Sequence, residues 1–271
     1  MSDLRLSYSD TGSGLPVVFL HPTPLTREYW RPLAERLMGV RAILPDLRGH
    51  GQSPLGTELP TGGFAPVPDA PVLTMGQLAK DVLALLDSLE LPSAVFVGCS
   101  IGGYVLFELW RQAPERVRGL AFVCSKPQPD APAAALRRAQ TIARVRAGES
   151  PQLFDAMART LCGQTAQERD PSILVRLRAQ MLCSPEALVA VQAGLATRPD
   201  SLPTVSTLTV PLLAIAGGED PGVTEEEMGV LSTAPGSLVF QQLDDAGHFA
   251  AFEQPDRVAA LLQPWLDPFQ S

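Results

Sequence analysis

The chain has 271 residues and a mass of 28.9 kDa, which is enough for one large domain or two small ones with a sizeable core. Its composition, 45% hydrophobic and 18% charged, excludes an intrinsically disordered chain and a collagen-like repeat. The 21 basic and 29 acidic residues give a net charge of −8, which disfavours binding to nucleic acid or to an anionic membrane surface.

Short apolar runs alternate with helical patterns along most of the chain. Some runs, such as residues 17–20, are apolar throughout, which is typical of strands in a sheet covered on both faces. Strands separated by helices predict an α/β fold with a mostly parallel central sheet. The first strand, which precedes a glycine turn at 12–14, is the expected antiparallel edge. The predicted strands are residues 4–9, 16–20, 41–45, 94–98, 117–124, 211–217 and 238–243.

Three helices of this core have clear signals in the sequence. Two begin with a threonine N-cap that is followed three residues later by Gln or Glu, Thr74 with Gln77 and Thr224 with Glu227. The helix after Thr74 has an apolar stripe made of Leu78, Val82, Leu85, Leu86 and Leu89. The closing helix, residues 255–266, is predicted to turn four side chains inward, Val258, Leu261, Leu262 and Trp265.

Two segments interrupt the alternation. Residues 54–72 hold five prolines, which predicts an extended surface loop whose role the sequence leaves open. Residues 127–206 lack a convincing strand and have helical patterns near 131–147, 151–162, 171–182 and 185–196. We therefore divide the chain into a core, residues 1–126 and 207–271, and a helical cap, residues 127–206, inserted between two sheet strands.

Several site classes are disfavoured. The N-terminal residues 1–14 lack the apolar stretch of a signal peptide, and no apolar run of membrane-spanning length follows, so a cytoplasmic location is predicted. With three histidines in the chain, a dedicated multi-histidine metal site is disfavoured. The hydrolysis predicted below requires neither a metal nor a cofactor. The cysteines lack the spacing of a zinc site or a disulfide framework and are expected in the core: Cys99, Cys124, Cys162 and Cys183.

Residues 98–103, Gly-Cys-Ser-Ile-Gly-Gly, follow a predicted strand and precede a helical stretch. A GxSxG pattern at such a turn is typical of a nucleophile elbow, where glycines on both sides of the serine avoid collisions with the neighbouring strand and helix. The helix N-terminus then favours negative charge near the hydroxyl. We predict that Ser100 is the nucleophile; the alternative is a plain tight turn with a capping serine.

A serine nucleophile needs a base, and the base needs a carboxylate to orient it. His248 directly follows the last predicted strand, at the edge where an open α/β sheet gathers its site. Asp220 follows the preceding strand in the same way. Glu219 is expected to point away, and Asp244 and Asp245 lie too near His248 in the sequence to reach its ring easily.

Hydrolysis through an acyl-enzyme also needs two N–H donors for the oxyanion. Ile101, directly after the serine, should provide one. In the His-Pro-Thr-Pro loop at 21–24, Thr23 is the residue between two prolines that has an N–H to offer. The alternative is a rigid loop whose Thr23 N–H faces water or a carbonyl oxygen.

These motifs occur in an order that resembles α/β-hydrolases of the esterase, lactonase and non-haem haloperoxidase-like group. The resemblance covers essentially the whole chain, and the helical insertion resembles the cap of enol-lactonase-like members. The motifs are HPTP at 21–24, PDLRGHGQS at 45–53, GCSIGG at 98–103, AGGED at 216–220 and DAGHF at 245–249.

The resemblance implies the α/β-hydrolase fold, with Ser100, Asp220 and His248 as the catalytic triad and Thr23 and Ile101 as the oxyanion hole. It also implies that the segment 46–53 is a structural turn beside the site. One position departs from the family, which usually has His-Gly where this chain has His-Pro at 21–22. The serine disfavours the dehalogenases and epoxide hydrolases of this fold, which have aspartate there.

Other residues near the site have two interpretations. Cys99 occupies the wrong position of the elbow for a nucleophile and is expected to fill the core. Trp30, Met157 and Phe249 are predicted to line an acyl pocket, with hydrophobic filling under the cap as the alternative. A basic run in the cap is either a solvated helix face or a carboxylate site, and it consists of Arg137, Arg138, Arg144 and Arg146.

The sequence thus predicts a serine hydrolase that cleaves a small-molecule carboxylic ester or lactone through an acyl-enzyme. One alternative retains the triad but hydrolyses a carbon–carbon bond or makes a peracid. Another is a ligand-binding receptor on this fold without turnover. The sequence determines neither the substrate nor the oligomeric state.

Overall fold

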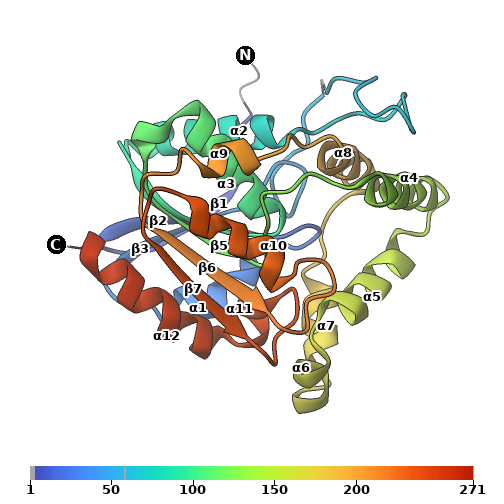
Figure 1. The fold of residues 1–271 in the computed structure, drawn as a ribbon. Helices are drawn as coiled ribbons and strands as arrows, with labels where there is room; N and C mark the ends of the chain where they lie inside the picture. Colours follow the sequence, from blue (N-terminus) through green and yellow to red (C-terminus); the bar gives the residue numbers. More distant parts are fainter. Residues whose placement is uncertain (1–3, 58, 271) are drawn as a thin grey trace.

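The computed structural model describes residues 4–57 and 59–270. Its centre is a seven-stranded sheet with the order β1-β3-β2-β4-β5-β6-β7 (Figure 1). β1 is antiparallel to β3, and the other neighbouring strands are parallel, so the predicted α/β class is confirmed. The strands are β1 (Tyr8–Gly12), β2 (Leu15–Leu20), β3 (Val40–Pro45), β4 (Ala94–Cys99), β5 (Val117–Val123), β6 (Leu212–Gly217) and β7 (Leu238–Leu243).

The first strand differs from its prediction. It begins at Tyr8 rather than at residue 4, and it continues to Gly12. The register pairs Tyr8 with Pro45, the last residue of β3, so the ladder between the two strands stops there. β1 is an antiparallel edge, as predicted, although it pairs with β3 and not with the strand that follows it in the sequence.

Helices cover both faces of the sheet, and the predicted helix starts are confirmed. The Thr74 hydroxyl oxygen accepts a hydrogen bond from the Gln77 N–H at 3.1 Å, and Thr224 forms a complete capping box with Glu227. The helices are α1 (Arg31–Ala34), α2 (Met75–Ser88), α3 (Ile101–Gln112), α10 (Glu225–Gly229), α11 (Ala250–Glu253) and α12 (Pro255–Leu266). Short 3-10 turns are η1 (Arg27–Tyr29), η2 (Pro114–Arg116), η3 (Val230–Thr233) and η4 (Asp267–Phe269). The predicted inward side chains of α12 are buried or half-buried, Val258, Leu261, Leu262 and Trp265.

Two apolar cores lie on opposite faces of the sheet, because alternate residues of a strand point to opposite faces. Val17 and Phe19 of β2 pack in one core together with side chains of α1 and α12. Val18 and Leu20 pack in the other core together with α2 and α3. The continuous apolar run of β2 is therefore explained by burial on both faces.

Between β5 and β6 the chain forms a group of helices, most of which lie to the right of the sheet in Figure 1. The predictions near 131–147, 151–162 and 185–196 are confirmed. The prediction for 171–182 is too long, and α6 lies outside the predicted helices. Pro171 separates α6 from α7 because a residue before proline is disfavoured in a helix. The helices are α4 (Pro132–Arg146), α5 (Ser150–Leu161), α6 (Gln164–Arg169), α7 (Ile173–Ala179), α8 (Pro185–Ala196) and α9 (Leu202–Val205).

The proline-rich segment 54–72 has no helix or strand among its described residues. Phe64 and Val72 are buried in the same core as much of the helical insertion. The Asp69 carboxylate pairs with Arg146 of α4 at 3.1 Å. The segment is thus an extended loop, as predicted, and it packs against the insertion.

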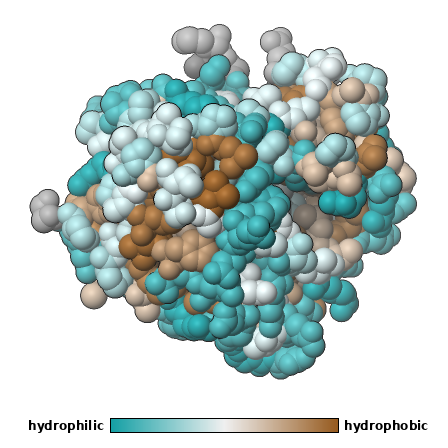
Figure 2. Space-filling view, viewed as in Figure 1, coloured by the Kyte–Doolittle hydropathy of each residue, from teal (hydrophilic) through white to brown (hydrophobic). Residues whose placement is uncertain are grey.

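Figure 2 shows one face of the molecular surface, which is largely polar. Apolar side chains gather over the start of β7, the edge strand, where Val239 is 44% exposed and Leu238 and Phe240 are half-buried. In the described part of the chain, no helix has the length and apolar character needed to cross a membrane.

Candidate active site

Ser100 lies in the sharp turn between β4 and α3. Its backbone φ is 53° and ψ is −116°, a conformation that residues with a side chain rarely adopt. A Cβ added to Gly98 would lie 2.5 Å from the Gly102 carbonyl carbon, and a Cβ added to Gly102 would lie 2.1 Å from the Leu20 oxygen. The glycines of the motif are therefore required by close backbone approach, as the pattern predicts for a nucleophile elbow.

Asp220 and His248 form a direct pair after the ends of β6 and β7. Nδ1 of His248 lies 2.7 Å from Oδ2 of Asp220. The other carboxylate oxygen, Oδ1, accepts hydrogen bonds from the N–H groups of Gly222 at 2.8 Å and Val223 at 3.2 Å. The carboxylate is thus held in place from both sides and orients the imidazole.

The environment of His248 favours its charged form. Burial lowers the pKa of His248, but the negative charge of Asp220 and its hydrogen bond to the ring outweigh burial, so the pKa is raised above its ordinary value. The imidazolium that forms when the ring takes a proton is therefore stabilised by its partner.

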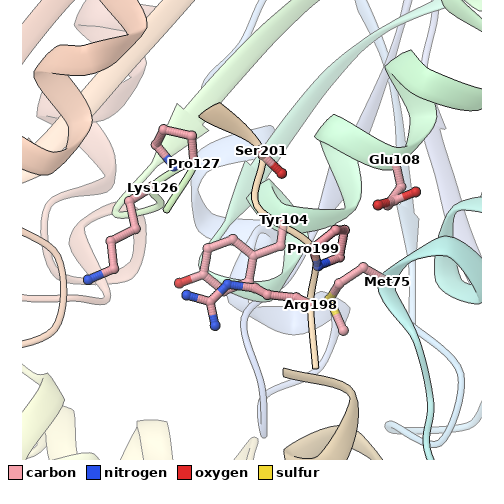
Figure 3. Close-up of a pocket in the computed structure, with 8 residues that line it drawn as sticks. All are labelled: Met75, Tyr104, Glu108, Lys126, Pro127, Arg198, Pro199 and Ser201. Carbon is pink, nitrogen blue, oxygen red and sulfur yellow. The ribbon is translucent and has the colours of Figure 1, made fainter. Parts of the chain in front are cut away.

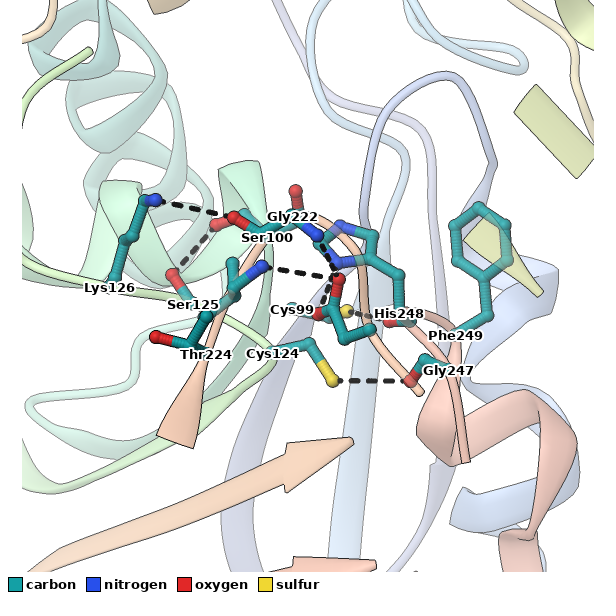
Figure 4. Close-up of polar contacts among 12 residues, drawn as sticks. Cys99, Ser100, Cys124, Ser125, Lys126, Gly222, Thr224, Gly247, His248 and Phe249 are labelled. Atoms are coloured by element: carbon teal, nitrogen blue, oxygen red, sulfur yellow. Dashed lines mark hydrogen bonds and ion pairs between the residues drawn. The ribbon is translucent and has the colours of Figure 1, made fainter. Parts of the chain in front are cut away.

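Ser100 lies beside the loop that carries His248. The Cys99 thiol contacts the His248 carbonyl oxygen at 3.6 Å, and the Cys124 thiol contacts the Gly247 carbonyl oxygen at 3.6 Å. In Figure 4, the Ser100 side chain and the His248 imidazole both lie above the Cys99 and Cys124 thiols. The structure thus brings the segments of all three predicted triad residues together at one edge of the sheet.

The other candidate carboxylates are bonded elsewhere. Glu219 accepts hydrogen bonds from Thr165, so it points away from His248, as predicted. The Asp245 carboxylate pairs with Arg257. Asp220 is therefore the carboxylate that the fold presents to the imidazole.

Thr23 and Ile101, the predicted oxyanion-hole donors, lie on adjoining segments of the chain. The start of α3 packs on the end of β2, which the contact between Gly102 and Leu20 demonstrates, and Thr23 follows β2 closely. In the described part of the chain, neither the Thr23 N–H nor the Ile101 N–H donates to a protein acceptor. Free N–H groups at this place fit the predicted role, and that role stays a prediction.

A buried histidine holds the side chain of Thr23. Nε2 of His50 lies 2.9 Å from the Thr23 hydroxyl, and Nδ1 lies 3.1 Å from the Arg48 carbonyl oxygen. A carbonyl oxygen can only accept a hydrogen bond, so Nδ1 of His50 carries the ring proton and donates it. Nε2 of the neutral ring then has no proton and accepts from the Thr23 hydroxyl. Burial lowers the pKa of His50 to about 4, so the ring is neutral and suited to this arrangement.

The turn at residues 46–53 is held by its own side chains. The Asp46 carboxylate accepts from the N–H groups of Arg27 at 2.8 Å and Gln52 at 3.0 Å. Arg48 forms a buried two-pronged ion pair with Asp81 of α2, at 2.6 and 2.7 Å. These contacts agree with the structural role that the resemblance implies for this turn.

A model of the alpha/beta hydrolase family matches residues 17–261, which include every predicted triad position. The chain belongs to the alpha/beta hydrolase family. The fold predicted from the motifs is thereby confirmed, and the chain is an enzyme of this family.

Three relatives are similar to this hydrolase, two of them over most of its length and one over less than half. An esterase from Thermogutta terrifontis is 33% identical, with a TM-score of 0.89, and the match covers 98% of this chain and 94% of that one. The 3-oxoadipate enol-lactonase 2 of Acinetobacter baylyi is 29% identical over 216 residues, covering 79% of this chain and 73% of the relative. A non-heme chloroperoxidase from Streptomyces lividans is 37% identical over 128 residues, covering 45% of this chain and 42% of the relative.

The predicted pocket residues of the hydrolase differ in exposure. Trp30 is fully buried between Phe19 and Tyr29, with ring centroids 5.5 and 4.7 Å away. Phe249 is also fully buried, and Met157 is half-buried against the same core. The burial of Trp30 and Phe249 agrees with hydrophobic filling, and a role for these residues in an acyl pocket stays a prediction.

The basic run of α4 does not act as one group. Arg137 is exposed to solvent, and Arg144 pairs with Glu149 at 2.7 Å. Arg138 is half-buried and pairs with Asp130. The run is therefore mostly a solvated helix face, with one member that holds the insertion together.

A narrow crevice lies beside α3, one turn after Ser100 (Figure 3). The Arg198 guanidinium lies 4.4 Å from the centre of the Tyr104 ring and fills the crevice. The crevice therefore has no free volume that a water molecule could enter. The crevice is therefore a packing feature. Its lining residues are Met75, Tyr104, Glu108, Lys126, Pro127, Arg198, Pro199 and Ser201.

One buried carboxylate near the site was outside the sequence predictions. Glu253 in α11 is 8% exposed and accepts hydrogen bonds from backbone N–H groups on both sides of His248. A glutamate within five residues of the base, in an otherwise apolar stretch, is the signal that could have pointed to it. Among the described residues, no group of three or more His, Cys, Asp or Glu side chains is placed to hold a metal ion.

Proposed function

We propose that this enzyme hydrolyses a small carboxylic ester or lactone through an acyl-enzyme on Ser100. The observation that carries the proposal is the 2.7 Å hydrogen bond between Asp220 and His248 beside a serine in a strained strand-to-helix turn. This arrangement supplies a nucleophile, a base and the carboxylate that orients the base. The esterase and enol-lactonase relatives agree with such a substrate class.

In the first step, Oγ of Ser100 attacks the carbonyl carbon while Nε2 of His248 takes the hydroxyl proton. The carbonyl oxygen becomes negatively charged and accepts from the N–H groups of Thr23 and Ile101. His248 then gives the proton to the leaving oxygen, the carbon–oxygen bond breaks, and the acyl-enzyme remains.

In the second step, a water molecule attacks the acyl carbon and gives a proton to Nε2 of His248. The carbon–oxygen bond to Ser100 breaks, and the serine oxygen regains the proton from the imidazole. The carboxylic acid is released. We further propose that residues 127–206 cover the site as a cap, because the Leu161 carbonyl oxygen accepts from the His248 N–H at 2.8 Å.

The test is the Ser100→Ala variant, assayed with p-nitrophenyl esters of increasing acyl length. We expect kcat to fall about a thousandfold or more with folding unchanged, because the variant lacks the nucleophile. Ser206→Ala is the matched control, since the Ser206 hydroxyl is exposed and, among the described residues, bonds only to the nearby Pro203 carbonyl. Equal rates for Ser100→Ala and wild type would refute the proposal.

A second reaction on the same triad is favoured by one comparison. The partial match to a non-heme chloroperoxidase suggests that hydrogen peroxide could replace water as the attacking molecule and release a peracid. Assays with acetate and peroxide, run beside the ester panel and a carbon–carbon cleavage substrate, rank these reactions. A protein that reacts with an organophosphonate but turns over none of these substrates would be a receptor.

A further inference from the structure

One buried carboxylate, that of Glu253, bonds the loop that carries His248 at two points. Oε2 of Glu253 accepts from the Gly247 N–H at 2.7 Å, and Oε1 accepts from the Phe249 N–H at 3.0 Å. These N–H groups belong to the residues immediately before and after His248. A carboxylate that bonds both flanks of a residue restricts the backbone of that residue more than a single bond could.

The same carboxylate reaches the helical insertion. Oε2 of Glu253 also accepts from the Gly163 N–H at 3.1 Å. Gly163 belongs to the α5–α6 joint, which we define as residues 161–165. A Cβ added to Gly163 would lie 2.7 Å from the Gly247 nitrogen, so the joint and the histidine loop touch backbone to backbone.

Two further bonds attach this joint to the catalytic segments. The His248 N–H donates to the Leu161 carbonyl oxygen at 2.8 Å. On the other side, the Thr165 N–H donates to Oε2 of Glu219, the neighbour of Asp220, at 3.0 Å. The α5–α6 joint therefore contacts the loops of both the base and its orienting acid.

We propose that Glu253 is a positioning residue for the hydrolysis, fixing the backbone on both sides of His248 and tying it to the α5–α6 joint. The inference rests on the proposed function of His248 as the base. Burying a carboxylate is costly, and three backbone N–H groups at one anion offset that cost. An amide or an apolar side chain would be sufficient for helix packing, but neither accepts three N–H bonds.

The charge of Glu253 also acts on the imidazole. Groups from separate elements face His248: Asp220 after β6 and Glu253 of α11 raise the pKa of its ring, while Lys126 after β5 lowers it. Burial raises the pKa of Glu253 itself to about 7, against the hydrogen bonds from the three N–H groups. Because the charge of each group affects the titration of the other, the effect of Glu253 is read from the whole titration curve of His248.

The test is the Glu253→Gln variant, which has nearly the same shape but no charge and one acceptor fewer. We expect the pKa of His248, followed by NMR of its ring, to fall by about half a unit or more, because a raising charge is removed. We also expect kcat to fall about tenfold or more with KM little changed, since the base is misplaced. The chain has three histidines, so the signals can be assigned.

Glu219→Gln is the matched control, because Glu219 is also a carboxylate that bonds the α5–α6 joint but does not flank His248. We expect this variant to leave the pKa of His248 unchanged. If Glu253→Gln leaves that pKa at the wild-type value, the proposal is overturned, whether or not kcat falls, because a loss of kcat alone would mark a general packing defect.

A measurement on the wild-type chain covers the case in which Glu253→Gln does not fold. The amide signals of Gly163, Gly247 and Phe249 should shift together with one midpoint near the pKa of Glu253, about 7. Independent behaviour of these amides would contradict a shared carboxylate. Neither NMR measurement requires turnover, so both test Glu253 separately from Ser100.

Discussion

The three histidines have two different roles, which depend on the partners of their ring nitrogens. Nε2 of His21 accepts from the Leu47 N–H at 2.8 Å, and Nε2 of His50 accepts from the Thr23 hydroxyl. Burial is the main cause that lowers the pKa of both, so both remain neutral supports. His248 alone among them pairs with a carboxylate, and its pKa is raised.

The raised pKa of His248 predicts the pH dependence of hydrolysis. The base must be neutral to take the serine proton, so kcat/KM should fall on the acid side with a midpoint above the ordinary histidine value of about 6.5. In Asp220→Asn the carboxylate charge is lost, which should move this midpoint to lower pH and reduce kcat about a thousandfold or more. Initial rates with a short ester across pH check both effects, and an acid limb that stays in place would contradict the role of Asp220.

At the scale of single residues, the sequence predicts Ser100, Asp220 and His248 because each lies in a recognisable motif within a few residues of the end of a strand. Glu253 has no such motif. Its role depends on Gly163 and Gly247, which are far apart in the sequence and meet only in the folded chain.

At the scale of elements, strand and helix boundaries follow the sequence closely where a local signal sets them. The N-cap at Thr74 and the capping box at Thr224 are such signals. β1 begins later than predicted because its partner β3 ends at Pro45, which lies opposite Tyr8. The residue pattern of a strand does not show which other strand will pair with it or where that strand ends.

The elbow between β4 and α3 gives a stability prediction. Gly102→Ala would place a Cβ 2.1 Å from the Leu20 backbone oxygen, so we expect a loss of about 2–4 kcal/mol in the free energy of unfolding. Gly229→Ala in α10 is the control, because a Cβ there has nothing within 4 Å, and a helical alanine should be neutral or slightly stabilising. Urea denaturation of both variants checks this, and equal stabilities would contradict the tight elbow.

At the scale of the whole molecule, buried ion pairs within the insertion hold Arg198 against the core. The Asp130 carboxylate pairs with Arg138 of α4 and with Arg198, which follows α8 and covers the Tyr104 ring of α3. The side chains of Asp130 and Arg198 are 6% and 4% exposed. These contacts attach α4 and α8 of the insertion to α3, the helix that begins after Ser100.

Breaking these pairs should therefore destabilise the molecule. Asp130→Ala leaves the Arg198 charge buried without its carboxylate, and we expect a loss of about 2–4 kcal/mol in the free energy of unfolding. Asp256→Ala removes the exposed pair with Arg36 and should change little, because water screens that pair. Denaturation of the two variants in parallel checks the difference, and a small effect at Asp130 would mean that the apolar contacts alone hold the insertion.

The sequence by itself determined the α/β class, most strand and helix positions, and the order of the serine, acid and base motifs. These features depend on periodicity, caps and glycine turns, which act over a few neighbouring residues. The tertiary structure decided the pairing of β1 with β3, the burial of Trp30 and Phe249, and the meeting of Glu253 with Gly163 beside His248. These features depend on packing between distant segments, and a local pattern does not encode which distant segments meet.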